Sequence, residues 1–204
     1  MKRDTRQKII ADTIRLIEAK DSRLMDITVR DICREAGTSI SQINYHFATK
    51  ENLIAQCVQV IIGDVIEKFG AVSATVKEPT AFLKLKRLLT LNFDFLYNNE
   101  NISKISILTD HEKPHANDNT AQTIRAYLPL MEAALRERNL AYDPRQIATM
   151  IVLDFQGMFL RTDVIQQEMH IDLRDEEARR QWVSSYADRV FCESATPKIA
   201  ERGC

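Results

Sequence analysis

A short run of polar side chains near the N-terminus has types and spacing suited to contacting a polyanion. Residues 39–47 read SISQINYHF and include no carboxylate. Projected as a helix of about 100° per residue, the run gathers its apolar side chains on one side and its polar side chains on the other. The polar side consists of Thr38, Ser41, Gln42 and Tyr45, flanked by Asn44 and His46. Hydroxyl and amide groups of this kind can hydrogen-bond to the base edges and phosphates of a duplex.

The individual side chains suit different contacts. Gln42 can pair with an adenine edge, and Ser41 with either kind of base pair. Tyr45 and His46 can contact phosphates, which set register rather than sequence choice. Thr28 and Lys50 stand at expected helix starts, where backbone amides attract phosphate. A small helical bundle that binds nothing can carry a similar polar face, so the pattern alone leaves that alternative open.

Two short helices and a turn are expected to position this polar side. Thr28, with Asp31 three residues later, is a capping pattern that starts the first helix, and Gly37 ends it in the left-handed conformation. The second helix is expected to begin at Thr38 or Ser39 and to run to about residue 47. The side chains expected to face the first helix are Ile40, Ile43 and Phe47. These dimensions are typical of a helix-turn-helix.

The remaining sequence also favours helices. The chain contains 5 Gly and 5 Pro in 204 residues, fewer than extensive β-hairpins require. Apolar spacing predicts helices over 5–20, 49–70, 79–98, 102–108, around 124–135, 143–169 and 172–192, with loops at 71–78 and 109–119. We therefore predict an all-α fold of about nine helices. Residues 1–50 form a three-helix head with the helix-turn-helix, residues 51–204 form a larger helical body for dimerisation and ligand binding, and the helix over 49–70 connects them.

Composition and motifs narrow the class of protein. Residues 1–50 carry ten Lys/Arg against seven Asp/Glu, whereas residues 51–204 carry 18 against 22, which fits a nucleic-acid-binding head on an acidic body. We find no signal peptide, membrane span or catalytic signature, and expect a cytoplasmic protein that is not an enzyme. His111 and His115 lie near two acidic residues, but their polar surroundings favour a solvated loop, so we expect no metal and no cofactor.

The motif residues resemble those of a known family. Residues 28–39, TVRDICREAGTS, and residues 43–53, INYHFATKENL, resemble the TetR family of regulators, and the string YHFxxKExL is the most specific part. The close resemblance covers about residues 5–60. It implies an Ω-shaped homodimer that places two recognition helices in successive major grooves of a roughly palindromic operator, with half-site centres about 34–36 Å apart or a multiple of that spacing.

The resemblance also implies which residues contact DNA. They are Thr28, Ser39, Ser41, Gln42, Asn44, Tyr45, His46 and Lys50. Two positions depart from the family pattern, because many members carry Gly in place of Ser41 and Tyr in place of Asn44. The short amide of Asn44 replaces a phosphate-contacting ring, so its own contact is less defined than that of Tyr45.

The last two predicted helices are expected to form the dimer interface. The helix over 143–169 is too apolar from Ile147 to Leu160 to face water, and a four-helix bundle of two subunits would bury it. The residues expected at the interface are Met158, Trp182, Tyr186 and Phe191. The same residues can instead serve the subunit's own core, and the sequence leaves that alternative open.

A ligand site is expected in the body. The candidate residues are Phe93, Tyr97, Met131, Met150, Asp154, Phe155 and Phe159, and each apolar one can also be plain core. Asp154 is expected to be buried, where a carboxylate needs either a ligand or an arginine across the dimer. The function expected is a repressor released from its operator by a small-molecule effector. The alternative is a DNA binder of the same fold without small-molecule sensing, constitutive or protein-regulated, and possibly an activator.

Overall fold

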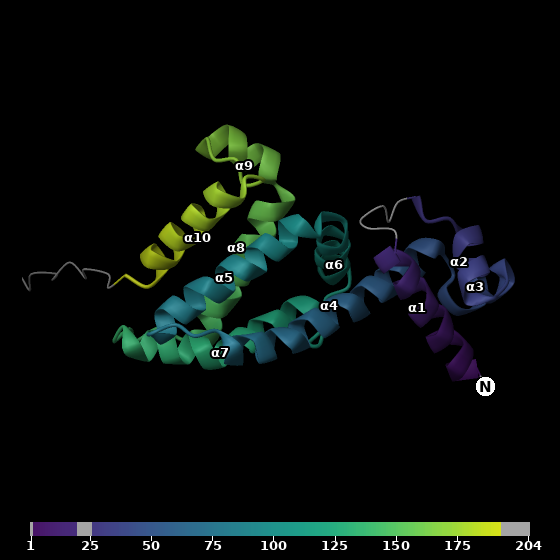
Figure 1. Ribbon diagram of the computed structural model, residues 1–204, viewed down its shortest axis with the longest axis horizontal. Helices are drawn as coiled ribbons and strands as arrows, with labels where there is room; N and C mark the ends of the chain where they lie inside the picture. Colours follow the sequence, from purple (N-terminus) through teal and green to yellow (C-terminus); the bar gives the residue numbers. More distant parts are fainter. Residues whose placement is uncertain (1, 20–25, 193–204) are drawn as a thin grey trace, which may run out of the picture.

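A computed structural model of the chain describes residues 2–19 and 26–192. Within these ranges every regular element is a helix (Figure 1). The helices are α1 (Lys2–Ala19), α2 (Val29–Ala36), α3 (Ile40–Phe47), α4 (Lys50–Thr75), α5 (Ala81–Asn98), α6 (Glu100–Glu112), α7 (Asn119–Glu137), α8 (Pro144–Leu160), α9 (Thr162–Met169) and α10 (Glu176–Val190). The all-α prediction is confirmed, with ten helices in the described residues where about nine were expected. Leu24 and Met25, which lie between the first predicted helix and the capping residue Thr28, are outside these residues.

The N-terminal head has its own apolar core. Helices α1 to α3 pack at one end of the molecule, where α4 begins (Figure 1). The core consists of Ile9, Ile17, Ile27, Ile32, Ala36, Ile43, Phe47, Leu53, Ile54, Cys57 and Val58. The last four of these belong to α4, so the first two turns of that helix are part of the head. A boundary drawn after residue 50 therefore cuts through this core.

The body has a second and larger core. It is formed by α5, α7, α8 and α10, and α7 makes its most extensive contacts with α8 and α5. Helix α4 runs from the head into the body and lies along α7 (Figure 1). An aromatic cluster stands at the centre: Phe93 contacts Phe155 and Trp182, with ring centroids 4.6 Å and 5.4 Å apart. Helix α4 thus joins the two cores, and α6 also contacts both, with Ile105 against the head core and Ile107 in the body core.

Several helix ends differ from the sequence prediction. Helix α4 continues to Thr75 because a single Gly, such as Gly70, costs a helix interior only about 1 kcal/mol. Thr80 rather than Pro79 begins α5, since its hydroxyl accepts from the amide of Leu83 at 3.1 Å. The loop expected at 109–119 shrinks to 113–118, as α6 extends to Glu112.

The helix predicted over 143–169 is divided in two. Helix α8 ends at Leu160, and Arg161 separates it from α9. The Thr162 hydroxyl donates to the carbonyl of Phe159 at 2.8 Å and also meets the Tyr97 hydroxyl at 2.9 Å. Such side-chain-to-backbone bonds compete with the helical ladder and bend helices. Helix α7, by contrast, runs through Pro129 without being divided.

No helix in the described part of the chain is long and apolar enough to cross a membrane. The same residues contain no group of three or more His, Cys, Asp and Glu side chains placed to hold a metal ion.

Candidate nucleic-acid interface and ligand cavity

The α3 helix presents its polar side to solvent. Ile43 and Phe47 are buried in the head core, as expected from their spacing. Ile40, expected beside them, is instead 49% exposed because it is the first residue of the helix and projects past the packed face. The side chains left exposed are Ser39, Ser41, Gln42, Asn44 and Tyr45, and His46 is half-buried.

Hydroxyl caps fix the two short helices. The Thr28 hydroxyl accepts from the amide of Asp31 at 3.1 Å, and the Asp31 carboxylate accepts from the Thr28 amide at 3.1 Å. Gly37 ends α2 with a φ of 59°, a left-handed conformation that favours glycine. The Ser39 hydroxyl accepts from the amide of Gln42 at 3.3 Å. The turn between α2 and α3 is therefore held by the left-handed backbone of Gly37 at one end and by the Ser39 side-chain cap at the other.

A cation lies beside the start of α2. The Lys50 ammonium donates to the carbonyl of Ile27 at 3.2 Å, next to the N-cap residue Thr28. This one bond occupies one of the three ammonium donors. The Lys50 ammonium also lies 3.9 Å from the Glu51 carboxylate, and the Asp31 carboxylate accepts from the Thr28 amide, so two carboxylates already lie beside this positive end of α2. The structure thus brings the Lys50 ammonium to Ile27, the residue before Thr28.

The aromatic end of α3 is ordered by ring contacts. Tyr45 is 67% exposed, and its ring stands edge-on to that of His46 with centroids 5.0 Å apart. His46 in turn packs at 6.0 Å from the buried ring of Phe47. These contacts fix the direction in which the Tyr45 phenol leaves the surface.

A strained turn connects α3 to α4. Ala48 has φ 64° and ψ −48°, and the amide of Thr49 donates to the carbonyl of Phe47 at 2.8 Å. This is a γ-turn of the rare kind with positive φ, which a Cβ atom disfavours. The turn leaves two residues between the helices, so α3 and α4 are closely coupled.

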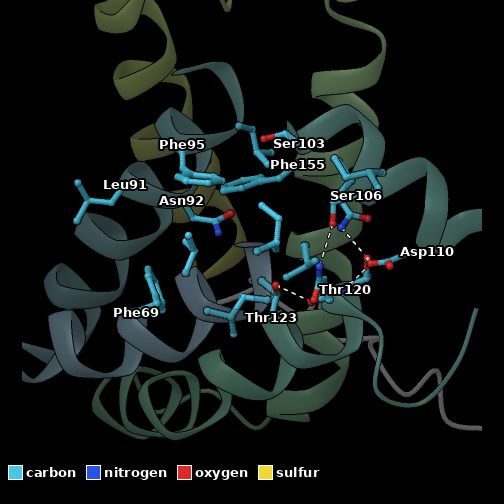
Figure 2. Close-up of a pocket in the computed structure, with 18 of the residues that line it drawn as sticks. Phe69, Leu91, Asn92, Phe95, Ser103, Ser106, Asp110, Thr120, Thr123 and Phe155 are labelled. Atoms are coloured by element: carbon cyan, nitrogen blue, oxygen red, sulfur yellow. Dashed lines mark hydrogen bonds between the residues drawn. The ribbon is translucent and has the colours of Figure 1, made fainter. Parts of the chain in front are cut away.

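The body contains a cavity of about 300 Å³ between α4, α5, α6, α7 and α8, which we call the body cavity. Most of its wall is apolar: Ile62, Val65, Ile66, Phe69, Leu91, Phe95, Leu96, Ile107, Val152 and Phe155. Its polar side chains gather mainly on α6 and α7. Figure 2 shows Ser106, Asp110 and Thr120 together at one side, with Phe69 and Leu91 at the opposite side.

The polar side of the body cavity is a hydrogen-bonded network. The buried carboxylate of Asp110 accepts from the amide and the hydroxyl of Thr120, both at 2.8 Å, and from the side-chain amide of Gln59 at 2.9 Å. The Thr120 hydroxyl accepts from Gln156 at 2.9 Å, and Asn119 donates to the Ser106 hydroxyl at 3.2 Å. Four helices therefore meet through polar side chains at this wall.

The predicted ligand residues are only partly brought together. Phe155 lines the body cavity. Phe93 and Met131 are fully buried in the core, and Tyr97 packs edge-on to Phe159 at 5.3 Å. Met150 lies on the surface at 51% exposure, on the face of α8 opposite the core.

The prediction of a buried Asp154 is wrong. The side chain is exposed, and its partner is Tyr186, whose phenol donates to it. Burial raises the pKa of Tyr186, and the hydrogen bond to Asp154 and its charge add to the rise, so the phenol remains the donor at neutral pH. The buried carboxylate of the cavity is Asp110, although the polar neighbours of this residue in the sequence predict a solvated loop.

The residues predicted for the dimer interface lie mostly in the subunit's own core. Trp182 and Phe191 are 7% and 1% exposed, so they have little surface to offer a partner. Tyr186 and Met158 are half-buried. The exposed residues on the other side of α8 include Met150, Leu153 and Gly157, and Arg161 follows at the same spacing just beyond the end of the helix. We call these four residues the α8 face.

The architecture, a helix-turn-helix head on a helical body, is that of a DNA-binding regulator. Comparison with known proteins agrees with this class. Residues 9–57 match the family of bacterial regulatory proteins, tetR family. The nucleoid occlusion factors SlmA of Escherichia coli O1:K1 / APEC and strain K12 / DH10B are 25% and 26% identical over 170 residues, covering 78% of this chain and 83% of theirs.

Solved structures share the whole fold. A TetR-family transcriptional regulator from Pectobacterium atrosepticum superposes with a TM-score of 0.65 at 17% identity, covering 93% of each chain. The regulator FadR from Bacillus subtilis, in complex with stearoyl-CoA, superposes with a TM-score of 0.56 at 17% identity, covering 91% of this chain and 97% of its own. The head therefore matches the tetR family of bacterial regulatory proteins over residues 9–57, and the whole chain has the fold of the solved TetR-family regulator.

Proposed function

We propose that the protein is a homodimeric repressor that binds a roughly palindromic operator and leaves it when a small molecule enters the body cavity. The observation that carries this proposal is the pairing of an exposed, carboxylate-free α3 surface with a largely apolar cavity bounded by the same helix, α4, that follows α3. One helix can therefore transmit a change at the cavity to the DNA-reading surface.

The α3 surface suits a division of work on DNA. Ser41, Gln42 and Asn44 point to solvent as short donors and acceptors that fit base edges. Tyr45, Lys50 and Thr28 suit phosphates, and Ser39 and His46 support them through the cap and the ring contacts. We assign sequence choice to the first group and register on the duplex to the second.

The α8 face supports dimerisation. Met150 and Leu153 are each 51% exposed, although large apolar side chains usually avoid water. Gly157 lies between Leu153 and Arg161 with no neighbouring atom within 4 Å of an added Cβ. The subunit itself gains nothing from this glycine, which costs a helix about 1 kcal/mol relative to alanine. A second α8 helix approaching closely at Gly157 accounts for all three residues.

The size and chemistry of the body cavity support an effector of mainly apolar character. A cavity of about 300 Å³ is at the lower end of the range for small-molecule sites. The likeness to FadR, solved with stearoyl-CoA, concerns the fold, and we do not carry that ligand over to this chain.

Selection of bound fragments from random DNA tests the proposal. We expect a recovered site with two-fold symmetry, bound by the dimer with the strong salt dependence of phosphate contacts. A screen of apolar and amphipathic compounds should then find at least one that lowers affinity for this site. Recovery of sites without symmetry, or operator affinity insensitive to every compound that binds the cavity, would contradict the proposal.

The similarity to nucleoid occlusion factors favours a second candidate, a chromosome-binding factor of that kind without small-molecule sensing. This similarity spans 170 residues and so extends beyond the head into the body. Mapping of bound sites in cells separates the two candidates. A repressor should occupy a few sites beside genes whose transcription rises when the protein is removed, whereas the second candidate should occupy many sites with no such change.

A further inference from the structure

The wall of the body cavity holds a carboxylate without a counter-cation. Asp110 is 6% exposed and lines the cavity (Figure 2). Within the residues that the structure describes, it makes hydrogen bonds but no ion pair. A buried charge of this kind is costly unless a cation or hydrogen bonds compensate it. Its three contacts are all to donors, which is how an ionised carboxylate is solvated inside a protein.

One of these donors comes from the helix that leads to the head. The side-chain amide of Gln59 on α4 donates to Asp110 Oδ1 on α6 at 2.9 Å. Thr120 on α7 supplies the other two donors, both to Oδ2. The Gln59–Asp110 bond therefore ties α4 to α6 at the cavity wall, nine residues beyond the start of α4. We call this bond the α4 latch.

A second polar group of the cavity lacks a partner. The Ser103 hydroxyl lies in the cavity wall at 1% exposure, and no hydrogen-bond partner is present within the described residues. Ser103 and Ser106 precede Asp110 by about two turns and one turn of α6, respectively. Apolar side chains of α4, α5 and α8 line most of the remaining wall, as Figure 2 shows for Phe69, Leu91 and Phe155.

We propose that the effector is a lipophilic ammonium compound whose cationic nitrogen binds Asp110 and thereby breaks the α4 latch. The inference deepens the proposed function and rests on it for the effect on DNA. An ammonium group donates to Oδ1 more strongly than the neutral amide of Gln59, because charge-assisted bonds are about twice as strong as neutral ones. The apolar tail fills the rest of the cavity.

Breaking the latch frees α4 at the cavity while its first two turns stay packed in the head core. A ligand acts on DNA binding only through its different affinity for two states of the protein. The ammonium compound favours the state in which Gln59 has left Asp110. Operator release therefore follows from competition between the ammonium group and the Gln59 amide for Asp110 Oδ1. Lys68, at the edge of the cavity, is exposed and can keep its own charge in water.

The test compares two probes of the same length, nonylamine and 1-nonanol, on the full-length protein. The amine is protonated at neutral pH, as lysine is with a pKa of about 10.4. Trp182, the single tryptophan, packs on the cavity residue Phe155 at 5.9 Å, so its fluorescence reports occupancy. We expect the amine to bind at least about tenfold more tightly than the alcohol. Asp110→Asn should remove this preference and leave the affinity for the alcohol unchanged.

Asp64→Asn is the matched control, because it makes the same carboxylate-to-amide change at an exposed residue of α4 that does not line the cavity. It should leave the preference for the amine intact. Gln59→Leu, which breaks the latch without a ligand, should weaken operator binding severalfold and make it insensitive to the amine. Thermal melting of each variant checks that it folds.

Several outcomes would overturn the inference. Equal affinity for amine and alcohol, no binding of the amine, or equal loss of both probes in Asp110→Asn would each do so. If another class of compound releases the operator, the cation inference fails and the proposed function stands. If no operator is found, the proposed function fails, and the fluorescence titrations still decide the chemistry of the cavity.

Discussion

Replacing Met150 and Leu153 together by serine tests the dimer interface assigned to the α8 face. Each side chain is 51% exposed in the single subunit, so about half of its surface is available to a partner. Full burial of such a side chain contributes about 1.5–3 kcal/mol, and half of it about 0.7–1.5 kcal/mol. In a two-fold interface every residue counts twice. The four half-exposed side chains therefore contribute about 3–6 kcal/mol.

That energy corresponds to a dimer dissociation constant raised about 10²- to 10⁴-fold. Sedimentation velocity over a dilution series measures the change, and thermal melting shows whether the subunit still folds. Leu83→Ser is the matched control, since Leu83 is 40% exposed on α5 and lies away from the α8 face. A dissociation constant that rises no more than in this control would refute the assignment.

Gly157 allows an independent test, because one substitution there should stabilise the subunit and destabilise the dimer. Leucine at this position should stabilise the subunit by up to about 1 kcal/mol, because it is a better helix former and the space around the Cβ is empty. The same side chain should weaken or abolish the dimer by holding the two helices apart. A Gly157→Leu protein that is more stable yet still dimeric at the wild-type concentration would mean that no helix approaches there.

Other expectations concern the head. Gln42→Ala should cost about 1–3 kcal/mol on the selected operator and nothing on random DNA, measured by fluorescence anisotropy; an equal loss on both would exclude base reading. Lys50→Ala should weaken binding to all sequences and lower the slope of log affinity against log salt by about one, and an unchanged slope would exclude a phosphate contact. Ala48→Gly should raise the free energy of unfolding by about 1 kcal/mol because it relieves the positive φ of 64°, whereas a decrease would show that the turn is not strained. Burial raises the pKa of the Cys57 thiol to about 12, so Cys57 should stay protonated and unreactive towards alkylating agents well above neutral pH. The exposed Cys192 should react before Cys57, and mass spectrometry of the labelled peptides gives the order of the two; labelling of Cys57 at the rate of Cys192 would contradict the expectation.

The head was largely predictable from the sequence because its signals are local. Thr28, Asp31 and Gly37 act on backbone groups within a few residues of themselves, so their spacing alone predicts where α2 begins and ends. The inward direction of Ile43 and Phe47 follows from helical periodicity in the same way. The prediction that Ile40 faces the core is wrong, because periodicity does not tell how far the neighbouring helix extends along the first turn of α3.

The body depended on contacts between residues far apart in the chain, which a single sequence does not reveal. Asp110 looked like part of a polar loop, but Gln59, 51 positions earlier, and Thr120 satisfy its carboxylate and allow its burial. Asp154 sat in an apolar run and looked buried, yet α8 turns that side of the helix outward. The division at Arg161 likewise arises from a bond between Thr162 and Tyr97, 65 residues apart.

The γ-turn at Ala48 couples movements of α4 to α3, the helix that carries the proposed DNA-contacting residues. Gln59 lies nine residues from Lys50, or about 14 Å along the helix axis at 1.5 Å per residue. A tilt of α4 by about 10° around the level of Gln59 would displace the start of that helix by roughly 2 Å. The turn leaves no slack to absorb this shift, so α3 must travel with it. Because Leu53, Ile54, Cys57 and Val58 of α4 also pack in the head core, the rest of the head moves with that helix.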